Sequence, residues 1–151
     1  GFLEALRPDF KDYIKSVLNN AKILSETLKN NGFKIYSGGT DTHLMLVDLR
    51  PFNVKGNLAA ESLSNANITC NKNGIPFDSE KPMITSGIRL GTQAATTRGF
   101  GLKEFEKVGE LITKVVKGLS ENPEDNSKIE EEVRSEVIEL TSHFPIYKNL
   151  K

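Results

Sequence analysis

The sequence lacks several features that would point to particular classes of protein. Its 151 residues include a single cysteine, Cys70, which excludes an internal disulfide and favours a reducing compartment such as the cytoplasm. The 20 basic and 20 acidic residues give a formal net charge of zero, so no bulk attraction to nucleic acid or anionic membranes is expected. No apolar run approaches the roughly 18–20 residues of a membrane span. We therefore expect a cytoplasmic protein that binds neither nucleic acid nor membrane.

The first residues, Gly1–Ala5, also lack the basic stretch and the apolar core of a secretory signal. They lack an initiator methionine, so we expect that the chain is processed or cut from a longer protein. Its length and its 37% of hydrophobic residues suffice for one domain, residues 1–151, with its own core.

Two kinds of hydrophobic periodicity divide the chain. Apolar residues at three- and four-residue spacings predict helices over 8–31, 56–65, 102–119 and 126–142. Alternation predicts strands at 33–37, 43–49 and 85–92, the first two forming an antiparallel hairpin. We expect 66–70 to be extended, 71–83 a polar loop, 93–101 a turn or short helix, and 144–147 an apolar tail docked on the body. The order predicts an α+β fold, in which helices cover a small antiparallel sheet of three or four strands.

One arginine stands out in the alternating segment Thr85–Thr92. Ile88 and Leu90 should face one side of the strand, while Arg89 faces the other between two glycines. Small neighbours should leave the guanidinium uncrowded, which suits a bidentate grip on a carboxylate or phosphate. The segment alone favours a surface ion pair, the more common use of an arginine. The long polar loop that leads into the strand favours a binding site instead.

The sequence shows no catalytic constellation. His43 and His143 are far apart, and structural roles suit both better than catalysis. Neither pairs with Cys70 at a metal-ligand spacing, and a buried, inert thiol is the better interpretation of that cysteine. No glycine-rich phosphate loop is present. The residues therefore predict a ligand-clamping lobe whose reactive groups come from elsewhere.

Three collinear stretches carry a family resemblance. They are Ser37–Leu49 (SGGTDTHLMLVDL), Ala66–Pro76 (ANITCNKNGIP), and Thr85–Thr92 (TSGIRLGT) followed by Thr97–Phe100 (TRGF). On these stretches the chain resembles the C-terminal domain of the serine hydroxymethyltransferases, pyridoxal-phosphate (PLP) enzymes of fold type I. The resemblance extends from the first predicted helix to the apolar tail, and it implies the small α+β domain of such enzymes.

The resemblance implies specific roles for five residues. Arg89 matches the arginine that holds the α-carboxylate of serine or glycine, and Asn73 stands where the family contacts the pteridine of tetrahydrofolate. Lys81, Pro82 and Met83 fall where the family lines its folate pocket. The implied reaction converts serine and tetrahydrofolate to glycine and 5,10-methylenetetrahydrofolate, a step of one-carbon metabolism and glycine biosynthesis.

The resemblance also implies that most of the enzyme lies outside this chain. The family's PLP-binding lysine, ring-stacking histidine, pyridinium-pairing aspartate and catalytic glutamate belong to the larger preceding domain. No catalytic residue is therefore assigned here, and we expect the chain alone to be inactive. The full enzyme is expected to be a cytoplasmic homodimer with PLP as cofactor, tetrahydrofolate as co-substrate and no bound metal.

Two other interpretations stay open at this point. Small domains of other fold type I PLP enzymes share an arginine carboxylate clamp, although the segment Asn71–Asn73 argues against them. A free-standing α+β binding or interaction module is the alternative from a different class.

Overall fold

The computed structural model describes residues 1–146, so the predicted tail residue Tyr147 lies outside the described residues. The elements in chain order are α1 (Phe2–Ala5), α2 (Pro8–Asn30), β1 (Lys34–Ile35), the 3-10 turn η1 (Tyr36–Gly38), β2 (Leu44–Asp48), the 3-10 turn η2 (Arg50–Phe52), α3 (Gly56–Asn65), β3 (Asn71–Asn73), β4 (Gly87–Gly91), α4 (Gln93–Arg98), α5 (Leu102–Glu121) and α6 (Ser127–Ser142). None of the described helices is long and apolar enough to cross a membrane.

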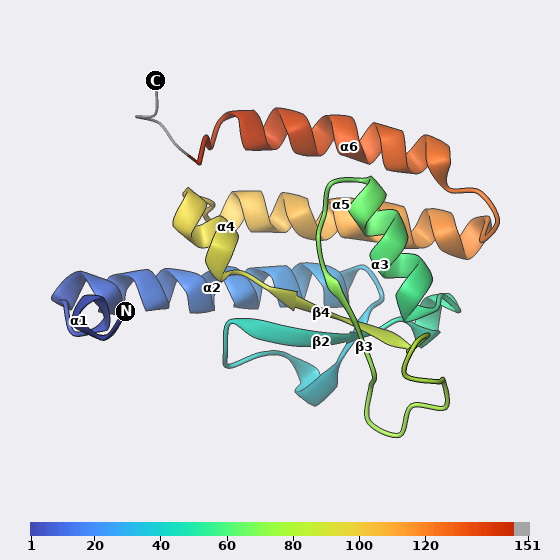
Figure 1. Cartoon of the computed structure of the whole chain (residues 1–151), viewed down its shortest axis with the longest axis horizontal. Helices are drawn as coiled ribbons and strands as arrows, with labels where there is room; N and C mark the ends of the chain where they lie inside the picture. Colours follow the sequence, from blue (N-terminus) through green and yellow to red (C-terminus); the bar gives the residue numbers. More distant parts are fainter. Residues whose placement is uncertain (147–151) are drawn as a thin grey trace.

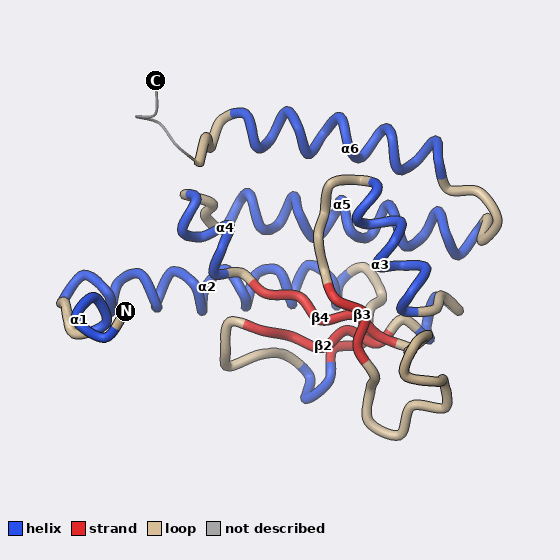
Figure 2. Tube along the Cα trace, viewed as in Figure 1, coloured by secondary structure: helices blue, strands red, loops and turns tan. Residues whose placement is uncertain are grey.

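The strands form one four-stranded antiparallel sheet in the order β1-β2-β4-β3. Helices α2 and α3 contact the sheet, α5 packs along α2, and α6 lies on the outer side of α5 (Figures 1 and 2). This arrangement confirms the predicted α+β fold with a small antiparallel sheet. The predicted hairpin is also confirmed, because Ile35 pairs with Val47 and Lys34 with Asp48.

One face of the sheet builds the core. Met45 and Val47 of β2 are paired with Leu90 and Ile88 of β4, and all four side chains are buried. They join a cluster with the apolar stripes of α2 and α5, which include Leu24, Leu28, Leu111, Ile112 and Val115. Burying such stripes supplies most of the stability of amphipathic helices, which explains why the periodicity located them well. The four predicted helices are present within three residues of their expected ends.

Several local details of the structure differ from the predictions. Residues 71–73 were expected in a loop but form the edge strand β3, while 66–70, expected to be extended, contain no strand. The first strand has only two residues, because the chain turns at Ser37, which has a φ of 61°. The short helix α1 was not predicted. The docked tail is confirmed as far as Phe144, whose ring centroid lies 4.8 Å from that of Phe100.

Candidate ligand-binding face of the sheet

The second face of the sheet, turned away from the core, carries polar side chains. Strand register places Leu46, Arg89 and Asn71 in one row across this face, and Lys34, Asp48, Gly87 and Asn73 in the next. We call these seven residues, with Leu44 and Gly91, the open face. Arg89 is exposed, whereas its chain neighbours Ile88 and Leu90 are 0% and 6% exposed. The predicted alternation of β4 is therefore confirmed, and it presents the guanidinium away from the core.

The two glycines beside Arg89 serve a different purpose from the one predicted. A Cβ at Gly87 would lie 2.6 Å from Cγ2 of Ile75 and 2.7 Å from the carbonyl oxygen of Val47. A Cβ at Gly91 would lie 3.0 Å from Cδ2 of Leu44. The space above both glycines is thus filled by neighbours, not left open for the guanidinium. The lack of a side chain at Gly87 lets the loop that precedes β4 pack closely on the strand through Ile75.

The carboxylate of the open face is already engaged. Asp48, whose side chain is 1% exposed, accepts hydrogen bonds from Nη2 and Nε of Arg50 at 2.6 and 3.0 Å, and Lys34 Nζ lies 4.0 Å away. Burial acts to raise the pKa of Asp48, but the hydrogen bonds and charge of Arg50 outweigh it and hold the pKa below its ordinary value. The buried carboxylate of Asp48 is therefore paired with two cations, Arg50 and Lys34.

Arg89 has no such partner among residues 1–146. No hydrogen bond or salt bridge to its side chain is formed there, and its strand neighbours on this face are Leu46 and Asn71. The surface ion pair favoured by the local sequence is thus not formed within the described part of the chain. An exposed guanidinium with five donors and no protein carboxylate suits a planar anion from outside.

Comparisons with known proteins identify the family. The family model for serine hydroxymethyltransferase matches residues 1–112. The chain is 96% identical over 151 residues to a serine hydroxymethyltransferase of Pelagibacter ubique (strain HTCC1062), covering 100% of this chain and 35% of that protein. It is 62% identical over 147 residues to that of Marinomonas sp. (strain MWYL1), covering 97% of this chain and 35% of the relative. The chain belongs to the serine hydroxymethyltransferase family.

A third serine hydroxymethyltransferase, from Paramagnetospirillum magneticum (strain ATCC 700264 / AMB-1), is 63% identical over 147 residues, which are 97% of this chain and 34% of the relative. The chain thus spans about a third of the length of the curated relatives it matches.

The four residues that the resemblance assigns to folate lie in or beside the loop between β3 and β4. Asn73 ends β3 on the open face, two pairs of the ladder from the Arg89 position, and its Nδ2 donates to the carbonyl of Gly74 at 2.7 Å. Lys81, Pro82 and Met83 are exposed in the turn before β4. The fold therefore brings Asn73 and Arg89 to one face. No hydrogen bond joins the other three to either residue within the described range.

Sequence reasoning missed Asp78, the centre of this same loop. Its Oδ2 accepts hydrogen bonds from the amides of Ile75 and Ser86 at 3.1 and 2.9 Å, and its Oδ1 accepts from the Glu80 amide and the Ser86 hydroxyl at 3.0 and 2.7 Å. Burial works to raise the pKa of Asp78, yet these donors hold it well below its ordinary value. An aspartate in a Gly/Pro-punctuated loop was the available signal, since aspartate commonly caps nearby amides.

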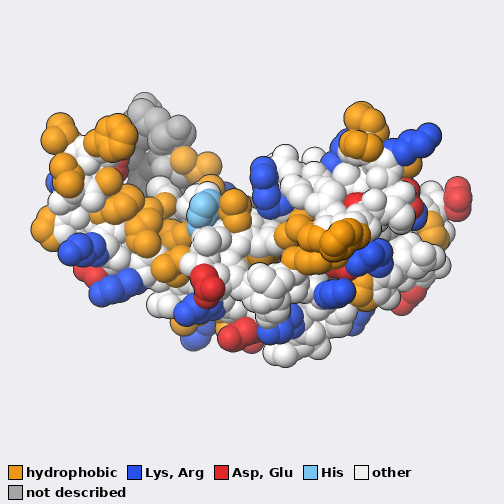
Figure 3. All heavy atoms as spheres, turned by 90° about the horizontal axis from the view of Figure 1, so that it is seen from below, with side chains coloured by type: hydrophobic (Ala, Val, Ile, Leu, Met, Phe, Trp, Pro, Cys, Tyr) orange, Lys and Arg blue, Asp and Glu red, His pale blue; other side chains and the backbone are white. Residues whose placement is uncertain are grey.

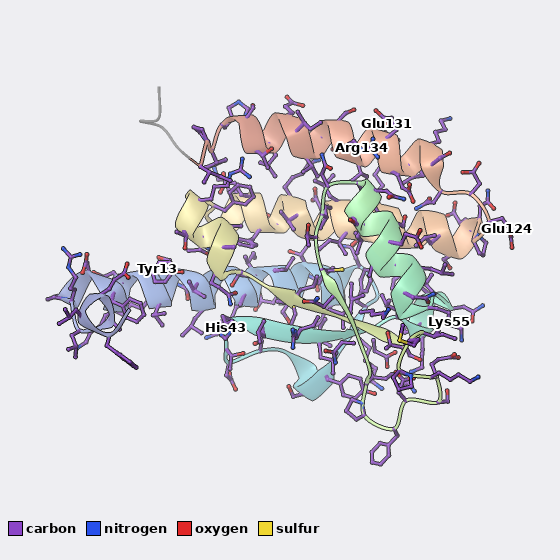
Figure 4. All side chains as sticks on the ribbon, viewed as in Figure 1. Tyr13, His43, Lys55, Glu124, Glu131 and Arg134 are labelled. Atoms are coloured by element: carbon purple, nitrogen blue, oxygen red, sulfur yellow. The ribbon has the colours of Figure 1, made fainter. Side chains whose placement is uncertain are left out.

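The other residues that the sequence singled out do not join the open face. Burial raises the pKa of the Cys70 thiol to about 11, which keeps it protonated and unreactive at neutral pH. His43 precedes β2 and His143 follows α6, so the two rings sit on different layers (Figure 4 labels His43). Among residues 1–146, no group of three His, Cys, Asp or Glu side chains is placed to hold a metal ion.

One large, mainly apolar hollow of the described chain lies away from the five predicted site residues. It measures about 1150 Å³ and is lined mainly by apolar residues of α4, α5 and α6. The charged side chain in its lining is Arg98, whose guanidinium donates hydrogen bonds to the carbonyl oxygens of Thr141 and Phe144 near the end of α6. None of the five predicted site residues lines it. This hollow offers apolar contact but no reactive group, so the open face is the better candidate in this family member.

Proposed function

We propose that this chain is the C-terminal lobe of a serine hydroxymethyltransferase and that Arg89 binds the α-carboxylate of serine or glycine. The observation that carries the proposal is the unequal charge of the open face. Its carboxylate, Asp48, forms salt bridges with Arg50 and Lys34, while Arg89 forms none with any acidic group among residues 1–146. A bidentate guanidinium on a rigid central strand is well suited to orient a small carboxylate.

The proposed reaction is that of the whole enzyme, which converts serine and tetrahydrofolate to glycine and 5,10-methylenetetrahydrofolate. PLP supplies the electron sink for this chemistry when bound. The donors of the open face fit a carboxylate better than PLP, because the lysine there, Lys34, is directed to Asp48. We therefore assign PLP to the remaining two-thirds of the protein, and to this chain only substrate binding and orientation.

The folate side of the site is proposed for the loop between β3 and β4. Asn73 presents an amide beside the open face, and Lys81, Pro82 and Met83 form an exposed polar and apolar rim. An amide matches the donors and acceptors of a pteridine edge, and Met83, which is 73% exposed, offers apolar surface to an aromatic ring.

Two exposed apolar regions fit a lobe that is covered in the complete enzyme. Phe2, Leu3 and Leu6 around α1 are 94%, 83% and 81% exposed, and Phe77 in the loop is 101% exposed. Figure 3 shows apolar side chains gathered toward two raised ends of the molecule with a hollow between them. Exposed apolar groups of this kind mark interfaces. We infer that they pack against the remainder of a cytoplasmic homodimer.

The decisive experiment replaces Arg89 in the full-length enzyme. Arg89→Ala is expected to lower kcat/KM for serine by a factor equivalent to about 2–5 kcal/mol, because the carboxylate of serine loses its desolvated charged partner. Arg89→Lys should recover little, since an ammonium group cannot form the bidentate pair. Steady-state kinetics with serine as the varied substrate measure both.

Arg134→Ala is the matched control, because that arginine is engaged by Asn65 and Glu131 and lies on α6 (Figure 4). The control should leave serine saturation unchanged. Unchanged saturation in Arg89→Ala would end the carboxylate proposal. A parent enzyme that turns over serine equally well without tetrahydrofolate would point to another fold type I PLP enzyme. The 151-residue chain alone should show no turnover.

A further inference from the structure

The loop between β3 and β4, residues 74–86, is closed by a single side chain. The carboxylate of Asp78 accepts four hydrogen bonds, three from backbone amides and one from the hydroxyl of Ser86. Two of the donors, Ile75 and Ser86, stand near opposite ends of the loop, so one carboxylate ties the strand that ends at Asn73 to the strand that begins at Gly87. Ionised carboxylates are acceptors only, which matches four donors.

Further contacts hold the loop in this conformation. Ile75 is 5% exposed and packs over Gly87, where a Cβ would lie only 2.6 Å from Cγ2 of Ile75. The first amides of α3 are used by the loop, since Gly56 N and Asn57 N each donate at 2.9 Å to the carbonyls of Thr85 and Ile84. Lys55 at the start of α3 forms a salt bridge with Glu80.

The conformation that Asp78 closes is a strained one. Phe77 has a φ of 56° and Thr85 a φ of 62°. Left-handed backbone at a bulky or β-branched residue is energetically unfavourable and persists only where surrounding contacts enforce it. The hydrogen bonds of Asp78 to residues that flank these two positions, Ile75 and Ser86, help to enforce it.

The positions of the two parts of the proposed site, Arg89 on the carboxylate side and Asn73 on the folate side, depend on this loop to different extents. Arg89 lies on β4, which is paired along its whole length with β2 and also with β3. Asn73 ends a three-residue edge strand that is paired only with β4, and the chain enters the loop directly after it. Loosening the loop should therefore displace Asn73 and the rim at Lys81–Met83 while Arg89 keeps its place.

We propose that Asp78 is a positioning residue, which holds the folate side of the site at a fixed distance from the carboxylate side without touching either substrate. This inference rests on the proposed function. It predicts that removing the Asp78 carboxylate raises the KM for tetrahydrofolate and leaves the KM for serine nearly unchanged. A purely structural role would lower stability and affect both substrates alike.

The test is Asp78→Asn in the full-length enzyme, with each substrate varied in turn. The amide keeps the shape but turns an NH₂ group toward amide donors, so it loses the charge and part of the acceptor set. The KM for tetrahydrofolate should rise about tenfold and the KM for serine should change less than about twofold. Amide hydrogen exchange of the peptide 74–86 in the same variant should speed up.

Two further variants complete the series. Ser86→Ala removes one of the four bonds and keeps the charge, so it should show the same selectivity with a smaller rise, and it secures the test should Asp78→Asn fail to fold. Asp125→Asn is the matched control, because Asp125 likewise caps an amide, that of Ser127 at 3.0 Å, but at the start of α6. It should leave both KM values unchanged.

The outcomes separate the inference from the function on which it rests. A wild-type enzyme that needs no tetrahydrofolate refutes the proposed function itself. A folate-dependent wild type with equal losses for both substrates in Asp78→Asn, or with no change in either, overturns the positioning role. A selective rise for tetrahydrofolate, graded from Ser86→Ala to Asp78→Asn, supports it.

Discussion

The two faces of one strand, β4, are built on opposite principles. Ile88 and Leu90 point into the core and are almost fully buried, whereas Arg89 between them is exposed. The buried face is held by volume and apolar contact with α2 and α5. On the open face Asp48 is paired with Arg50, and Arg89 has no acidic partner among residues 1–146. A change on the first face should cost stability, and a change on the second should cost binding.

The largest stability effect is expected for Ile88→Ala. The side chain is 0% exposed, and truncating a buried isoleucine costs about 2–5 kcal/mol through lost burial and a residual cavity. Arg89→Ala, one residue away, should change the free energy of unfolding by no more than about 0.5 kcal/mol. Chemical denaturation of the 151-residue chain measures both. Similar losses for the two variants would break the contrast between the faces.

Gly87→Ala should show that the open face is also closely packed beside Arg89. The new methyl group would meet Ile75 and the carbonyl of Val47 at 2.6 and 2.7 Å, so we expect a loss of about 1–3 kcal/mol from overpacking. Gly39→Ala is the control, because no atom lies within 4 Å of a Cβ there and its φ of 171° is open to any residue. An equally tolerated Gly87→Ala would show that the loop yields easily. Thermal unfolding distinguishes these results.

The smallest effect concerns acid. The pKa values of Asp48 and Asp78 lie below their ordinary value in the folded chain, so both carboxylates contribute stability that is fully present above about pH 4, the unfolded pKa. That contribution should be lost as the pH falls further through the folded pKa values. For Asp48 we expect about 1 kcal/mol, because its partner Arg50 is half-exposed to solvent.

Denaturation midpoints between pH 7 and pH 3 measure this loss, and Asp48→Asn should flatten part of the acid dependence. An identical pH dependence of stability in Asp48→Asn would show that Asp48 does not contribute to the acid sensitivity of the folded chain.

The helices could be predicted from the sequence because their stripes are long and the core selects them. The alternation around Arg89 was equally legible, since buried and exposed positions differ in polarity. Strand β3 was not, because Asn71–Asn73 carries no apolar signal and is extended only by pairing with β4.

The role of the glycines was predicted wrongly. The closest atom over Gly87 belongs to Ile75, a residue twelve positions earlier in the chain, which the local sequence around Arg89 does not reveal. Asp78 was missed for the same reason. Its donors are spread from Ile75 to Ser86, and only the closed loop brings them to one carboxylate. The exposure of Arg89 could be predicted from the sequence. That Asp48 is paired with Arg50, and that Arg89 has no acidic partner among residues 1–146, could be seen only in the structure.

The strand order places the two shortest strands, β1 and β3, at the margins of the sheet. They contain two and three residues, and each bears an exposed lysine, Lys34 and Lys72. Short, charged margins give a second chain little backbone to pair with. The sheet can therefore present the exposed Arg89 on one face without offering its edges as a template for edge-to-edge aggregation.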